Sequence, residues 1–258
     1  MFAMFGATIL VPILTGLDVS NTLLFAGLGT LLFHLITGGK VPAFLGSSFA
    51  FLGGYATIAP MLGEQQNIPN LEMLPYACFG VACAGLVYVI LAGLFKVFGA
   101  KKVMRFFPPI VTGPIIIAIG LNLSSSAINN CTGSWWIAIA AILIIVAANI
   151  WGKGMIKIIP ILLGVIGSYL LAVIFDADVR ANLVANVSEA KWFALPIKME
   201  QTVFGLFASG NVDAHKLLTA VITIVPLSLA TMVEHIGDVS AISSTCNRNY
   251  IENPGLHR

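Results

Sequence analysis

The sequence has very little charge. Aspartate, glutamate, lysine and arginine together make up 9% of its 258 residues, against about 25% in ordinary soluble domains. Hydrophobic residues make up 58%. A soluble chain of this composition could not cover its surface with polar groups, so we expect lipid to surround most of it. The net charge is +2, and the sequence contains no basic stripe. A nucleic-acid-binding protein would need such a stripe, so we expect no nucleic-acid partner.

Cysteines and catalytic motifs are also scarce. The four cysteines have neither metal-ligand spacing nor the framework of a small disulfide-rich domain, so we expect no metal and no disulfide. A phosphate-binding glycine loop, a nucleophile elbow and a His-Glu-x-x-His motif are all absent from the sequence. We therefore expect no cofactor, no ATP-driven transport and no enzyme activity.

Long apolar runs are what the sequence does contain. A helix needs about 20 apolar residues to cross the hydrocarbon core of a bilayer. By this measure the sequence has candidate segments at 1–15, 22–37, 42–62, 73–97, 106–123, 135–151, 155–175 and 216–242. We predict an all-α polytopic membrane protein with about eight transmembrane segments, located in the cell membrane.

The third of these segments has an unusual composition. It runs from Pro42 through Gly46-Ser47-Ser48 to Phe51 and then reaches two further glycines. These residues are poor helix formers, so a break with a short extended stretch is predicted. Irregular backbone at membrane depth is tolerated where it lines a cavity, and transporters often bind substrate at such breaks.

Lysine and arginine indicate the orientation. Alternate connections hold the basic residues, and the connections between them have none except the long 176–215 segment, where Arg180, Lys191 and Lys198 accompany several acids. Because short cytoplasmic loops are enriched in basic residues, we expect the N-terminus to be cytoplasmic and the 176–215 loop to be extracellular.

The acidic residues indicate where the chemistry lies. Of eleven, only Glu234 and Asp238 fall inside an apolar segment. Their spacing puts both on one helical face, one turn apart. Ionisable groups in a span are costly and often mark proton pathways, so this pair is the candidate proton-coupling site. The alternative is a water-exposed helix end, since Arg248 follows soon after. His235 points about 100° away from Glu234 and is expected to pack against a neighbouring side chain.

Several motifs are familiar in this order. They are residues 2–8 with Val11-Pro12, Gly46–Phe51, Trp192–Pro196, Glu234–Asp238 and Asn253–Arg258. Together they resemble the nucleobase–ascorbate transporter (nucleobase:cation symporter) family, and within it the bacterial uracil permeases.

The resemblance implies an inverted-repeat transporter, of which this chain holds the first repeat and the start of the second. It divides the chain into core segments at 1–97, gate segments at 98–175, an extracellular loop at 176–215, and a further core segment at 216–258. It also implies that Glu234 binds the edge of the nucleobase ring and that the Phe49 backbone contacts the base, with Ser48 beside it. Asp238 is expected to be a further substrate-binding residue, at a position that is histidine in a well-known uracil carrier and can be acidic in other branches of the family.

The implied function is proton symport of a nucleobase, with uracil as the expected substrate. The residue at Asp238 leaves a xanthine or other purine permease as an alternative. The family also includes homodimers. The chain covers about three-fifths of a family member, and we expect an incomplete fragment that cannot transport alone.

Two functional hypotheses outside this family are also open. A cation or solute channel could use the same acid pair, and it would show flux without saturation or proton coupling. An intramembrane enzyme could use the two carboxylates as acid and base, although no nucleophile or metal motif accompanies them.

Overall fold

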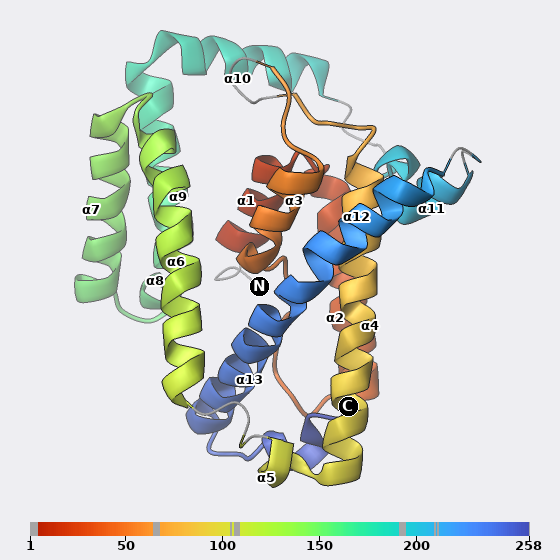
Figure 1. Cartoon of the computed structure of the whole chain (residues 1–258). Helices are drawn as coiled ribbons and strands as arrows, with labels where there is room; N and C mark the ends of the chain where they lie inside the picture. Colours follow the sequence, from red (N-terminus) through yellow and green to blue (C-terminus); the bar gives the residue numbers. More distant parts are fainter. Residues whose placement is uncertain are drawn as a thin grey trace. The chain divides into compact units, whose positions relative to one another are not determined.

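The computed structural model describes residues 5–63, 68–103, 105, 109–190, 195–208, 210 and 212–257. The start of the first predicted segment and most of the Trp192–Pro196 motif lie outside these residues. The regular structure of the described part is helical, apart from an isolated antiparallel bridge between Leu62 and Ile68 (Figure 1). The chain divides into two compact units, Met1–Gly6 with Leu121–Leu195, and Ala7–Gly120 with Pro196–Arg258.

The second unit contains most of the helices. Its N-terminal stretch has α1 (Phe5–Thr15), which begins just before it, then α2 (Val19–Ile36), the 3-10 turn η2 (Phe49–Phe51), α3 (Leu52–Ile58), α4 (Leu74–Phe98), α5 (Ala100–Val103) and the start of α6 (Pro109–Cys131). Its C-terminal stretch has η4 (Met199–Gln201), α11 (Val203–Ala208), α12 (Ala214–Ile224), η5 (Val225–Leu227), α13 (Ser228–Thr245) and η6 (Ile251–Gly255).

Among the described residues, three helical stretches are long and apolar enough to cross a membrane: Val19–Ile36, Leu74–Phe98 and Ala214–Thr245. The last joins α12 and α13 through the turn at Pro226, which cannot donate a backbone hydrogen bond. A fourth candidate is the pair α9 and α10, bent by 107°. These helices agree with a multi-pass membrane protein, while the number of eight segments stays a prediction.

The predicted break in the third segment is confirmed. Residues 42–48 form no regular structure, and a helix begins only at η2 and α3. The hydroxyl of Thr30 on α2 accepts a hydrogen bond from the Leu45 backbone N–H at 3.0 Å and lies 3.2 Å from the Leu45 carbonyl oxygen. A side chain of α2 therefore supplies the partners that a helix would have given to this backbone.

The core of the second unit depends on close helix approach. Ile224 at the end of α12 is fully buried against Gly54 of α3 and Gly80 of α4. A Cβ at Gly80 would lie 2.9 Å from the Ala220 carbonyl oxygen and 2.9 Å from Ile224. Small residues at such crossings are typical of membrane helices because they let two backbones approach. Figure 1 shows α12 crossing α4.

The first unit is a smaller helical group. It contains the rest of α6, then α7 (Trp135–Trp151), α8 (Met155–Ile158), α9 (Pro160–Phe175) and α10 (Ala177–Glu189). α7 packs along α9, where Gly164 and Gly167 face Ile145 and Ile144. The 176–215 segment is not an irregular loop, because Asp176 caps α10 by accepting hydrogen bonds from Asp178 N and Val179 N, and η4 and α11 follow.

Candidate functional site

Ser48 and Glu234 meet in the second unit. The Ser48 hydroxyl donates a hydrogen bond of 2.9 Å to Glu234 Oε2. Ser48 comes from the non-helical stretch before η2 and Glu234 from α13, so the contact joins the broken segment to the acidic helix. Both residues are half-buried. A hydrogen bond to an ionised carboxylate is among the stronger ones that a neutral donor can make.

The local backbone explains how Ser48 reaches the carboxylate. Ser48 has an extended conformation, with φ −95° and ψ 133°, and is the N-cap of η2. Its oxygen accepts a hydrogen bond of 3.2 Å from Ala50 N while its proton goes to Glu234. Phe49 is the first residue of η2, and the N–H of a first helical residue has no acceptor within the helix. The Phe49 N–H is thus a donor without an acceptor inside η2, one residue from the serine that contacts Glu234.

Glu234 lies at the border of the buried face of α13. That face consists of Ser228, Thr231, Met232, Val233, Ile236 and Val239. Asp238, one turn further, is exposed, and in the described part of the chain its carboxylate has no recorded hydrogen bond or ion pair. The structure therefore brings Ser48 and Glu234 together, has Phe49 next to Ser48 in the chain, and leaves Asp238 exposed.

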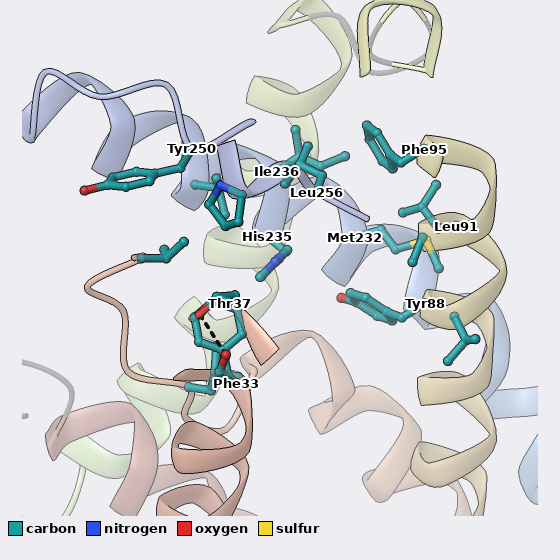
Figure 2. A pocket seen from close by; sticks show the side chains of 17 residues that line it. Phe33, Thr37, Tyr88, Leu91, Phe95, Met232, His235, Ile236, Tyr250 and Leu256 are labelled. Carbon is teal, nitrogen blue, oxygen red and sulfur yellow. Dashed lines mark hydrogen bonds between the residues drawn. The ribbon is translucent and has the colours of Figure 1, made fainter. Parts of the chain in front are cut away.

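His235 lies outside this group, as its helical position predicts. Its ring packs edge-on against Tyr88 of α4, with centroids 6.3 Å apart and an interplanar angle of 77°. Both side chains line a cavity of about 380 Å³ in the second unit, together with Phe33, Phe95 and Tyr250 (Figure 2). Sequence reasoning missed Tyr88, although a tyrosine in the middle of an apolar run was a visible signal.

Among the residues that the structure describes, no lysine, arginine or histidine forms an ion pair with Glu234 or Asp238. The ion pairs recorded among the described residues join Lys198 to Asp18 and Lys216 to Glu72. The same residues include no group of three or more histidine, cysteine or acidic side chains that could hold a metal ion. The site as described thus consists of a carboxylate with neutral partners. It can bind a proton, or accept hydrogen bonds from N–H groups of a ligand.

The sequence matches the permease family over residues 1–258. It is 37% identical to the uracil permease of Bacillus caldolyticus over 268 residues, which cover 100% of this chain and 57% of that protein. It is 36% identical to a protein of Haemophilus influenzae named as a probable uracil permease, again over 100% of this chain and 58% of the relative. RutG of Escherichia coli, whose name refers to pyrimidines, is 34% identical over 96% of this chain and 53% of its own length.

These relatives extend well beyond the matched region. The chain spans 57–58% of the length of the first two. They are named as permeases, which move solutes across membranes and are not enzymes.

Proposed function

The chain belongs to the permease family, and from that premise we propose that it forms part of a proton-coupled nucleobase permease. The proposed substrate is uracil, and the proposed binding residues are Glu234, Ser48 and Phe49. We place the protein in the cell membrane with its N-terminal side in the cytoplasm. Transport by the chain alone is not expected, since the relatives are much longer.

The hydrogen bond between Ser48 and Glu234 is the observation that carries this proposal. This hydrogen bond holds the Glu234 carboxylate beside the broken segment. Polar groups at membrane depth are costly, and proteins keep them there mainly where they serve a function. Uracil presents ring N–H donors beside carbonyl acceptors on one edge. Glu234 can accept from the N–H, and the N–H of Phe49, which has no acceptor inside η2, can donate to the adjacent carbonyl. The two protein groups thus match two neighbouring groups of the ring.

Proton coupling follows from the cost of charge. A carboxylate that moves through a low-dielectric environment is expensive, and a bound proton removes that cost. We propose that Glu234 and Asp238 take up the proton between them. The exposed Asp238 exchanges protons with water, and Glu234 contacts the substrate. Neutralising the pair then permits the conformational change that carries the base.

The relatives' names favour a pyrimidine over a purine. Two of the three relatives described above are named for uracil and the third for pyrimidines. A xanthine permease of the same family is the alternative, because Asp238 offers a further acceptor for a larger ring. Competition between labelled uracil and unlabelled xanthine distinguishes the two.

Equilibrium binding of radiolabelled uracil tests the proposal. The protein for this test is the chain joined to the part of the Bacillus caldolyticus permease beyond the matched region, called the completed chain below. Glu234→Gln is expected to weaken binding by at least about tenfold, because it removes a charged acceptor while keeping the shape. Glu200→Gln, on η4, is the matched control and keeps normal affinity. Unchanged binding in Glu234→Gln contradicts the proposed site.

Asp238→Asn tests the coupling separately. This variant of the completed chain is expected to bind uracil normally and to lose the stimulation of uptake by external acid. Acid-stimulated uptake equal to that of the unmodified protein contradicts the role of Asp238.

A further inference from the structure

A groove in the second unit runs along α4 and ends at a lysine. Its volume is about 660 Å³, and its walls come from α4, α5 and the start of α13. The lining includes Ile90, Leu94 and Phe98 of α4, Lys102 of α5, and Leu229 and Met232 of α13. Of the described residues that line it, only Lys102 has a polar side chain. We call this feature the α4–α13 groove.

The apolar lining of the α4–α13 groove is open to its surroundings. Ile90 is 64% exposed, Phe98 54% and Leu229 61%. Large apolar side chains that remain exposed together on a concave surface mark a place where another apolar group packs. In a membrane span that group can be the acyl chain of a lipid.

The length of the groove fits one leaflet of a bilayer. Its lining on α4 extends from Val87 to Phe98, 11 residues further along the helix. At 1.5 Å per residue this is about 16 Å. Half of a hydrocarbon core is about 15 Å thick. An acyl chain can therefore lie along the groove with its headgroup at the end where α4 stops.

That end of α4 carries positive charge without a recorded counter-ion. α4 ends at Phe98, and α5 follows directly after Gly99 (Figure 1). Lys96, Lys101 and Lys102 are all exposed here, and the ion pairs recorded in the described part of the chain involve none of them. Basic connections of this kind are expected on the cytoplasmic side, where anionic lipids give the membrane a negative surface.

We propose that the α4–α13 groove binds one anionic phospholipid. An acyl chain lies against Ile90, Leu94 and Leu229, and the phosphate accepts a charge-assisted hydrogen bond from the Lys102 ammonium group. A zwitterionic lipid fits the apolar part equally well, but the cation in its own headgroup competes with Lys102 for the phosphate. The groove therefore selects lipids by headgroup charge. Neither Ser48 nor Glu234 lines it, so this inference goes beyond the proposed function and does not depend on it.

Native mass spectrometry of the chain in detergent tests the headgroup contact. The chain is titrated with dioleoylphosphatidylglycerol or with dioleoylphosphatidylcholine, and the Kd of the first bound lipid is compared. We expect phosphatidylglycerol to bind at least about fivefold more tightly, and Lys102→Gln to remove this preference, since one lysine near a bilayer surface contributes an effect of that size. Lys153→Gln, at an exposed lysine of the first unit, is the matched control and keeps the preference.

Leu94→Trp tests the apolar part by placing a larger side chain inside the groove. We expect it to weaken the first binding event for both lipids. Val97→Trp is the control, because Val97 is 76% exposed on the same helix and does not line the groove.

Four results would overturn the inference. They are equal affinity for the two lipids, an undiminished preference in Lys102→Gln, unchanged lipid binding in Leu94→Trp, and displacement of the lipid by inorganic phosphate alone. The completed chain should bind phosphatidylglycerol with the same preference. Loss of this binding site in the completed chain would show that protein covers the groove, which also contradicts the proposal.

Discussion

Ser48 donates a hydrogen bond of 2.9 Å to Glu234 across a sequence separation of 186 residues. The contact connects a segment that cannot form a helix with a carboxylate that cannot be left unpaired in lipid. A non-helical segment and an unpaired carboxylate are each costly in a membrane protein. The hydrogen bond between Ser48 and Glu234 satisfies part of the hydrogen-bonding requirement of both. The broken third segment thus helps to set the position of the Glu234 carboxylate, the proposed binding group for the substrate.

Ser48→Ala is expected to weaken uracil binding by the completed chain by about tenfold. The variant loses a hydrogen bond to a carboxylate, for which about 1.5 kcal/mol is the lower end of the usual range. Titration with radiolabelled uracil measures the change. Ser47→Ala is the matched control, because Ser47 is the adjacent half-buried serine. Equal affinities in the two variants would show that the contact contributes nothing to binding.

Gly80→Ala is expected to destabilise the chain by about 1–3 kcal/mol, as overpacking does. The added methyl group would meet the Ala220 carbonyl oxygen and Ile224, each at 2.9 Å, and helices α4 and α12 would have to separate. Gly85→Ala on the same helix is the control, since nothing lies within 4 Å of a Cβ there. Thermal unfolding in detergent measures both. A Gly80→Ala midpoint at or above that of Gly85→Ala would contradict the described packing.

The pair of Asp18 and Lys198 predicts a pH dependence of stability. Lys198 Nζ lies 2.6 Å from Asp18 Oδ2, and this hydrogen bond lowers the pKa of Asp18 below its ordinary value of 3.8. A lowered pKa stabilises the fold above the pKa of the unfolded state, and the contribution is lost as pH falls through the folded-state pKa. Because Lys198 is largely exposed, the contribution is at most about 1 kcal/mol.

Asp18→Asn isolates this ion pair. Asparagine can still cap α2, as Asp18 does through Asn21 N, so only the charge is removed. We expect a lower unfolding midpoint than the unmodified chain at neutral pH and a difference that shrinks below about pH 4. Lys198→Gln should give the same loss, and combining the two changes should add little. A difference that is constant from neutral to acid pH would speak against the ion pair.

Composition and spacing predicted a large part of this structure. The apolar runs predicted the spans of α2, α4 and α12–α13, and the residues after Pro42 predicted the break. The scarcity of buried acids singled out Glu234. These features depend on local sequence, because a helix needs a certain length of apolar residues and a break needs poor helix formers.

Contacts over long sequence separations were not predictable in the same way. Nothing local indicates that the Thr30 hydroxyl bonds to the Leu45 backbone or that the Tyr88 ring packs against His235. The helical regions within the 176–215 segment were also missed, because its polar composition resembles that of a loop. Only tertiary packing decides which hydroxyl finds which partner.

Radiolabelled uracil uptake tests the central claim most directly. Permease-deficient cells expressing either the chain or the completed chain are compared at two external pH values. We expect saturable, acid-stimulated uptake with the completed chain, its loss in Glu234→Gln, and no uptake with the chain alone. Uptake by the completed chain that is unaffected by Glu234→Gln, or that neither saturates nor responds to pH, would contradict a proton-coupled permease built around Glu234.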